Sequence, residues 1–402
     1  MYKGLSKCLT VLLVFLSISS FAQETVSSLS GVIKDEKGSL IQGATIQLLH
    51  VPTGAITKTQ TNKNGIFNIT NLKPGGPYTV FITFVGFKEE KTDDVNLNLG
   101  NNPDLNVVMK VNTGSLEAVT VTTTKRNTNG VTIGRAQMNT LPTLGRSITD
   151  FTRLTPQSNN NSFAGTNFRY NNLTVDGAVN NDAFGFSNSA GGVSGGGQSG
   201  AAGSGTRTNP YSIDVIQEVQ VQLTPYDVKI GNFTGGSINA VTKSGTNDFH
   251  GSAYAYGRNQ ALVGKSVDGS NKKIGSDFHD YQYGATISGP IVKNKAFFIV
   301  NYEHTERQEP TFYNIYEDGT TDKGTPVLKS EADQIANKLK SLGYDPGSYL
   351  GAFKVFTKSD KLFGRLDFKL NNNNSLMLRA IYTNGSGNNL ERSATRFMFL
   401  VY

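Results

Sequence analysis

The sequence has 402 residues, enough for two or three domains, and its 44 glycines with frequent Asn, Ser and Thr favour turns and strands over helices. The formal charge is +7, but the basic residues are scattered and form no run interleaved with aromatics, which argues against nucleic-acid binding. Cys8 is the sole cysteine, and no segment approaches 18 consecutive apolar residues. These facts exclude a disulfide framework and a membrane-spanning helix.

The N-terminus has the pattern of an export signal. Lys3 and Lys7 precede a short apolar run from Leu9 to Ile18, and a small-x-small sequence follows at 20–22. This order is typical of a secretory signal peptide that is cleaved after Ala22. We therefore expect residues 1–22 to be removed on export, which leaves a mature chain without cysteine. If that chain enters a membrane, it must do so as a closed β-barrel.

Residues 23–112 are expected to form a small β-sandwich. Alternating segments such as 44–49 and 78–84 are separated by a turn about every ten residues, and Asn64-Gly65 is typical of a hairpin. A set of turn and core positions follows one family pattern: Gly31, Val32, Asp35, Gly38, Ile41, Gly43, Ala44, Ile46, Thr61, Gly65, Phe67, Ile69, Leu72, Pro74, Gly75, Tyr78, Gly86 and Phe87. By these residues the segment resembles the carboxypeptidase-regulatory-like family, which implies a structural sandwich without an active site; an exposed face for a ligand or partner is the alternative.

Two short strands are predicted within residues 209–249. Apolar residues nearly alternate with Gln217, Gln220 and Gln222 from Ile216 to Leu223, and a second strand is predicted at Ser237–Thr242. The first pattern predicts a sheet with one buried face and one wet face that is rich in amides.

This stretch closely resembles the end of the plug and the start of the barrel in TonB-dependent outer-membrane receptors. The match is to the Oar-like branch, which carries a carboxypeptidase-regulatory-like domain in front. It rests on IQEVQV at 216–221 and on GNFTGGSINAVTKSGTNDFHGSAY at 231–254. The resemblance implies a plug domain at 131–244 and a barrel from 245, in a Gram-negative bacterium of the Bacteroidota type. The expected fold class is mainly β: an N-terminal sandwich, an α+β plug, and the first strands of a truncated transmembrane barrel.

Residues 141–157 resemble the first helix region of the plug. Four apolar residues have the spacing of one helix face: Leu144, Ile148, Phe151 and Leu154. Residues 168–182 resemble a plug strand and turn. Their oxygen-bearing side chains, Asp176, Asn180 and Asp182, lack EF-hand spacing, so turn formation by Asx side chains is favoured over a calcium site. The glycine-rich run 187–205 would be a flexible linker on its own, or a loop facing solvent or substrate in a plug.

From residue 245 onward the sequence predicts strands of barrel length, apolar outside and polar inside. The candidate strands are Phe249–Arg258, Tyr281–Ser288, Lys295–His304, Leu362–Leu370, Ser375–Thr383 and Phe397–Tyr402. Lys293-Asn294-Lys295 is the expected short turn, and 305–357 the expected extracellular loop. The five complete strands cannot close a barrel, because an open edge in lipid leaves backbone groups unpaired, at several kcal/mol each. Since plugged transporters use about 22 strands, we expect the barrel at 245–402 to be incomplete and the chain to be the N-terminal part of a longer receptor.

The linker at 113–130 holds a segment that resembles a TonB box by its position and pattern. Its residues are Leu116, Glu117, Ala118, Val119, Thr120, Val121 and Thr122. An extended peptide with β-branched side chains can add a strand to the sheet edge of a TonB-type energy-transducing protein. Glu117, Val119 and Val121 are expected to contribute most. The alternative is that the segment forms the last strand of the sandwich.

The resemblance implies energised import of an unidentified substrate across the outer membrane, with a TonB-type protein, outer-membrane lipid and the substrate as partners. No cofactor and no metal site are expected. We also expect no enzymatic activity, because the four histidines lie in separate segments without zinc-site spacing. The alternatives are a secreted or surface β-sandwich protein that binds glycan or matrix, and a non-functional receptor fragment.

Overall fold

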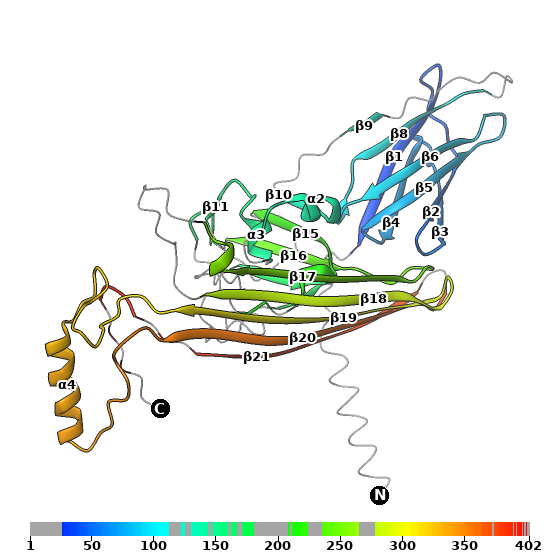
Figure 1. The fold of residues 1–402 in the computed structure, drawn as a ribbon. Coiled ribbons are helices and arrows are strands. Elements are labelled where there is room, and N and C mark those ends of the chain that lie inside the picture. The colour runs from blue at the N-terminus through cyan, green and yellow to red at the C-terminus, as the bar shows by residue number, and fades with distance from the viewer. Residues whose placement is uncertain are drawn as a thin grey trace, which may run out of the picture. The chain divides into compact units, whose positions relative to one another are not determined.

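The computed structural model consists mainly of strands, arranged in two compact units (Figure 1). It describes residues 26–111, 122–124, 130–143, 146, 148–159, 162–166, 171–180, 208–209, 211–223, 235–264, 278–371, 374–388, 390, 392–395, 397 and 399. Unit 1 comprises Met1–Leu141, Leu154–Asn181 and Gln217–Thr242, and unit 2 comprises Pro142–Arg153, Asp182–Ile216 and Lys243–Tyr402. The predicted signal peptide lies outside the described residues. Among the described helices, none is long and apolar enough to cross a membrane.

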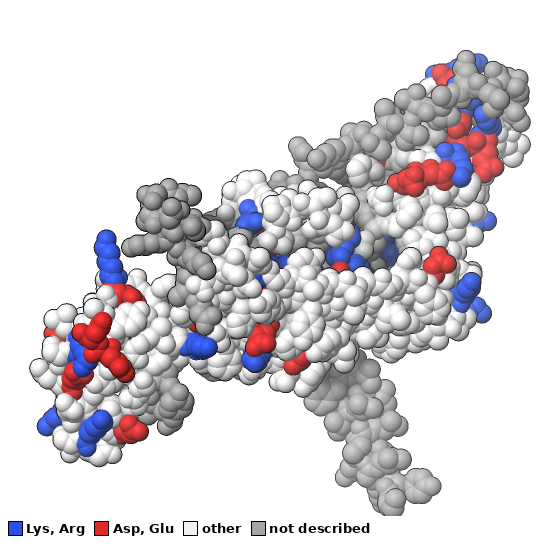
Figure 2. All heavy atoms as spheres, in the orientation of Figure 1, with Lys and Arg blue, Asp and Glu red and all other residues white. Residues whose placement is uncertain are grey.

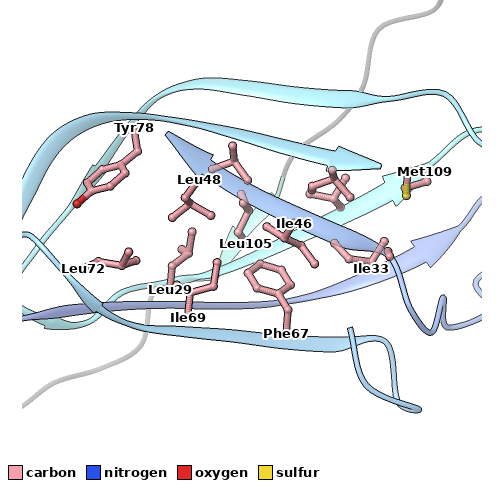
Figure 3. Close-up of a cluster of buried hydrophobic side chains, with 14 of the residues drawn as sticks. Leu29, Ile33, Ile46, Leu48, Phe67, Ile69, Leu72, Tyr78, Leu105 and Met109 are labelled. Atoms are coloured by element: carbon pink, nitrogen blue, oxygen red, sulfur yellow. The ribbon is translucent and has the colours of Figure 1, made fainter. Parts of the chain in front are cut away.

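The N-terminal part of unit 1 is a β-sandwich, as the sequence predicts. One sheet has the order β4-β1-β8-β9 with β7 beside β1, and the other has the order β3-β2-β5-β6. The strands are β1 (Ser27–Asp35), β2 (Thr45–His50), β3 (Ala55–Gln60), β4 (Ile66–Leu72), β5 (Gly75–Thr83), β6 (Glu90–Leu97), β7 (Gly100–Asn101), β8 (Asp104–Met109) and β9 (Thr122–Thr124). Their inward side chains form one core of 16 buried residues, including Ile46, Phe67 and Leu105 (Figure 3). Burial of this apolar surface is the main stabilising contribution.

Asn64-Gly65 is a turn between β3 and β4, which belong to different sheets, so the predicted hairpin is wrong, although the turn does need glycine. Gly65 has φ +65, and a Cβ there would lie 2.7 Å from the Ile33 carbonyl oxygen. A substitution would therefore strain the backbone and push against β1.

The second part of unit 1 is a mixed sheet with the order β10-β15-β16-β13-β14, here called the central sheet. Its strands are β10 (Gly130–Gly134), β13 (Asn172–Val175), β14 (Ala178–Val179), β15 (Ile216–Leu223) and β16 (Gly236–Thr242). Both predicted strands, β15 and β16, are present. The predicted wet face of β15 is wrong, because Glu218 and Gln220 are buried. β15 has strand neighbours on both sides, and residues near Leu99 cover its polar face.

The turn between β13 and β14 is formed by Asp176 and Gly177, both with positive φ. The Asp176 carboxylate accepts hydrogen bonds from the backbone N–H of Thr242 (2.8 Å) and from its hydroxyl (2.7 Å). The Asp176 side chain therefore attaches the turn to β16. Asp182, which the calcium alternative would also need, lies outside the described residues. A two-residue hairpin, β11 (Ser158–Asn159) with β12 (Ser162–Phe163), completes the described strands of this region.

The helix predicted at 141–157 is shorter than expected. The structure has α2 (Arg135–Thr140) before this range and α3 (Ile148–Thr152) within it. Arg146 has φ +48, which interrupts a right-handed helix, so α3 begins only after it. Ile148 and Phe151 are buried as predicted, Leu154 is exposed beyond the end of α3, and Leu144 lies outside the described residues.

Unit 2 contains a five-stranded antiparallel sheet, here called the wall, whose strands follow one another in chain order. They are β17 (His250–Asn259), β18 (His279–Val292), β19 (Ala296–Pro310), β20 (Lys354–Lys369) and β21 (Ser375–Gly387). The 3₁₀ helix η3 (Ile213–Val215) precedes β15, and η4 (Gln260–Leu262) follows β17. The predicted turn at 293–295 is confirmed, with Asn294 at φ +62 and the Lys295 N–H donating to the Val292 carbonyl (3.1 Å).

The loop predicted at 305–357 is wrong in extent and content. β19 and β20 remain paired as far as Pro310 and Lys354, and the intervening chain contains α4 (Lys329–Ser341). The Glu331 carboxylate accepts from the Leu328 N–H (2.8 Å) and thereby caps the start of this helix. Phe397 and Phe399 lie outside the strands, and the rest of the strand predicted at 397–402 is outside the described residues.

Candidate functional site

In the middle of the wall, exposed apolar side chains alternate with buried polar ones, and the buried face also contains apolar residues such as Phe297, Ile299 and Phe363. On β19 Tyr302 is 43% exposed, whereas the next residue, Glu303, is 0% exposed. On β20 Leu362 is 49% exposed and its neighbour Lys361 only 3%. A protein surrounded by water has the opposite distribution. Alternation with apolar side chains outside and polar side chains inside is the property of a transmembrane β-barrel.

The type of side chain on the outward face also changes along the strands, from aliphatic through tyrosine to charged. The register places Tyr302 level with Leu362 and Tyr382, and Tyr283 level with His304. On the side away from α4 the exposed residues are aliphatic, such as Ile287, Val300 and Leu378. On the α4 side comes the ion pair of Lys358 Nζ with Glu306 Oε1 (2.8 Å). Tyrosines between an aliphatic band and charged groups mark a membrane interface. In Figure 2 charged atoms gather over α4 and are fewer over the strands of the wall.

The segment 208–215 is hydrogen-bonded to the polar face of the wall, within unit 2. Asp214 on η3 accepts from the hydroxyls of Thr286 (2.7 Å) and Ser252 (3.2 Å). Lys243 Nζ lies 3.6 Å from the other Asp214 oxygen. At the start of the segment, the Thr208 and Ser359 hydroxyls are 2.7 Å apart. Asp214 thus bonds to two neighbouring wall strands, β17 and β18.

A buried ion pair lies beside this segment. Lys361 Nζ donates to Glu303 Oε1 (2.7 Å), and the Tyr254 hydroxyl donates to Glu303 Oε2 (2.6 Å). Ser212 Oγ lies 2.7 Å from the Tyr254 oxygen. Because a tyrosine has a single hydroxyl hydrogen, Ser212 is the donor in that contact. The Glu303 charge is therefore compensated within the wall by Lys361, and Ser212 of segment 208–215 adds neutral hydroxyl contacts to Tyr254 and Glu303.

Arg146 adds a second contact to β17. Its guanidinium carbon lies 3.9 Å from the centroid of the Tyr256 ring and 4.9 Å from that of Tyr254. The Arg146 carbonyl accepts from Asn209 Nδ2 (3.2 Å), which links the two segments on this face. Cation–π contacts of this kind contribute about 0.5–2 kcal/mol, more where water is excluded.

Comparison with known proteins agrees with this geometry. Residues 28–110 match the model of the carboxypeptidase regulatory-like domain, and residues 241–396 match that of an outer membrane beta barrel domain. The TonB-dependent transporter Oar of Myxococcus xanthus is 34% identical over 119 residues, which cover 25% of this chain and 11% of Oar. The chain is related to the TonB-dependent outer-membrane receptors. Like them, it belongs to the outer membrane.

Solved structures also overlap with parts of the chain. The outer membrane transporter YddB of Escherichia coli is 14% identical, with a TM-score of 0.43, over 64% of this chain and 33% of YddB. A 5-hydroxyisourate hydrolase of Klebsiella pneumoniae is 18% identical, with a TM-score of 0.20, over 25% of this chain and 94% of the hydrolase. The chain therefore spans about a tenth of Oar and a third of YddB.

The TonB-box-like residues predicted from the sequence are almost wholly outside the described part of the chain. Of Leu116–Thr122 only Thr122 is described; it begins β9 and pairs with Asn106 of β8. In the described residues there is no group of three or more side chains that could hold a metal ion.

The sequence analysis did not identify Asp214, Glu303 and Lys361, which make charged contacts at the polar face of the wall. One indication was available for two of them. Glu303 and Lys361 each adjoin an outward apolar residue in an alternating strand, which assigns them to the inner face of the barrel that the TonB-dependent receptor family implies.

Proposed function

We propose that the chain is the N-terminal portion of a TonB-dependent receptor that imports a substrate across the outer membrane at the expense of energy from the inner membrane. The observation that supports this most is the inverted polarity of the wall together with the hydrogen bonding of segment 208–215 to its polar face. In this proposal residues 131–244 act as the plug, and 245–402 supply the first barrel strands.

The energy would reach the plug through the linker at 113–130. Leu116–Thr122 would pair as an added strand with the sheet edge of a TonB-type protein. Backbone hydrogen bonds would give affinity, and the side chains of Glu117, Val119 and Val121 would give specificity. No bond is made or broken in the substrate.

Replacing Val119 with proline tests this role. Proline removes one backbone donor and restricts the preceding residue, so the loss should be about 1–3 kcal/mol, or roughly 5- to 150-fold in Kd. The full-length receptor would be titrated with the periplasmic domain of its TonB-type protein. Val119→Ile is the matched control, since it keeps the N–H and the β-branch, and it should bind like the wild type. Equal Kd values for all three proteins would overturn the assignment of this segment.

A further inference from the structure

Leu99 lies in a loop at the end of the sandwich, and hydrogen bonds attach this loop to the start of β1. The Asn98 N–H donates to the Asn102 side-chain oxygen (2.6 Å), and Asn102 Nδ2 donates to the Ser28 carbonyl (3.0 Å). The next residue, Gly100, donates its N–H to the Val26 carbonyl (3.0 Å). Leu99 is 2% exposed, yet it is not part of the 16-residue sandwich core. Its burial therefore comes from other neighbours.

Those neighbours include two side chains of β15. Glu218 Oε1 accepts from the Leu99 N–H (2.6 Å), and Gln220 Nε2 donates to the Leu99 carbonyl (3.5 Å). Residues two apart on a strand project from the same face. Both backbone groups of Leu99 are thus bonded by one face of β15. Glu218 is itself only 3% exposed, so neither partner can exchange this contact for water without separating the two surfaces.

A second contact joins the same two parts of unit 1. Gly75, at the start of β5, has φ +98, and a Cβ there would lie 2.9 Å from Gln217 Nε2. The side chain of Gln217 therefore packs closely against the glycine backbone. Two separate points of the sandwich therefore contact β15: Leu99 bonds to Glu218 and Gln220 on one face, and Gly75 packs against Gln217, which projects from the other face.

We propose that β15 is the docking surface for the base of the N-terminal sandwich, and that Glu218 and Gln220 hold the sandwich through the peptide groups of Leu99. The sandwich and the central sheet then move as one body. The docking is independent of whether the receptor imports a substrate. The linker at 113–130 joins the sandwich to β10, the strand paired with β15.

The Glu218 carboxyl also makes the docking dependent on pH. Burial raises its pKa to about 7, and the hydrogen bond from Leu99 opposes that rise. Strands β10 and β16 and residues 97–103 contain no charged side chain; Arg135 follows β10, and Asp104 follows the loop. The docked state binds the proton more tightly than the free carboxyl, whose pKa is 4.5. Docking is therefore strongest below pH 4.5 and weakens as the pH rises through 7, by about 25-fold between pH 5.5 and 8.0.

The test is hydrogen exchange of the peptide at 97–103 in the full chain, measured by mass spectrometry and corrected for the intrinsic effect of pH. Glu218→Ala should speed exchange there at least tenfold. Gln222→Ala is the matched control, since Gln222 lies on the same face and strand without bonding to Leu99, and it should leave the rate unchanged. Glu218→Gln keeps an acceptor but cannot ionise, so its exchange should be slow at pH 5.5 and at pH 8.0, whereas the wild type loses protection at the higher pH.

Exchange in β16 shows whether the central sheet stays folded in each variant. Unchanged protection of 97–103 in Glu218→Ala, with β16 intact, would overturn the docking. If Glu218→Ala loosens β16 as well, Glu218→Gln decides the matter: a variant that loses protection between pH 5.5 and 8.0 as the wild type does would refute the role of this carboxyl.

Discussion

Removing Lys361 should destabilise the wall far more than removing Lys358. The Lys361 and Glu303 side chains are 3% and 0% exposed, with Nζ and Oε1 2.7 Å apart. In Lys361→Met the Glu303 carboxylate stays buried without its counter-ion and keeps neutral hydroxyl contacts such as that from Tyr254. An unpaired buried charge of this kind costs about 3–5 kcal/mol of the free energy of unfolding.

Lys358 and Glu306 form a matched control on the same two strands. Their ion pair is 2.8 Å long, but the side chains are 53% and 36% exposed. Water already solvates both charges, so Lys358→Met should cost no more than about 1 kcal/mol. The two substitutions remove the same residue type from pairs of nearly equal length, so burial is the main difference; Lys361 also donates to the Thr305 hydroxyl (3.3 Å).

The free energy of unfolding would be measured by urea titration of the receptor in lipid vesicles, followed by circular dichroism. The double variant Glu303→Gln with Lys361→Met should recover at least half of the loss, because the amide still accepts from Tyr254 without carrying a charge. Equal losses in Lys361→Met and Lys358→Met would contradict the inverted polarity of the wall. A double variant as unstable as the single one would show that the buried charge is not the cause.

Two further predictions concern the sandwich and the outward face. Burial, with a smaller contribution from Lys73, lowers the pKa of His50 from 6.5 to about 4. The folded sandwich therefore binds fewer protons than the unfolded chain, and its stability, complete above pH 6.5, should fall by about 2 kcal/mol between pH 7 and pH 5. Urea titration at both pH values in a Glu218→Gln background, which removes the opposite pH dependence of Glu218, checks this, and adding His50→Phe should remove the difference. On the wall, Val300→Arg places a charge in the aliphatic band and should cost about 2 kcal/mol or more, whereas His304→Arg at the tyrosine level should cost less than about 1 kcal/mol. Equal effects on unfolding in vesicles would contradict the assigned membrane level.

Strand positions in the wall were predictable because alternation of period two is local. Leu362, Leu366 and Phe368 alternate with polar residues in the sequence itself, and β20 contains them all. The strand ends were not predictable. Pairing of β19 with β20 extends to Pro310 and Lys354 through residues such as Glu306 and Lys358, whose polar character favours a loop until the register of the neighbouring strand is known.

The polar face could not be predicted for a different reason. Glu303 and Lys361 are 58 residues apart, and only the register of β19 and β20 brings them together. Likewise, the Gln-rich face of β15 has the composition of a solvated surface. Its burial depends on the loop around Leu99, more than 100 residues away. Alternation determines which residues share a face, but not what covers that face.

The wall and segment 208–215 are joined in a way that lets them separate without leaving a buried charge. The Glu303 carboxylate has its counter-ion, Lys361, on a neighbouring wall strand, and Ser212 of the segment contributes only its neutral hydroxyl to the Tyr254–Glu303 pair. Lys243 Nζ lies 3.6 Å from one Asp214 oxygen, and the hydroxyls of Thr286 and Ser252 donate hydrogen bonds from the wall to the other. Each hydroxyl contact contributes about 0.5–1.5 kcal/mol net, because water replaces it on separation. The described bonds of Thr208, Ser212 and Asp214 to the wall therefore all involve neutral hydroxyl groups, whereas the Glu303–Lys361 ion pair lies within the wall. A force that moved the segment would break these bonds one at a time and expose a surface whose charges are already paired.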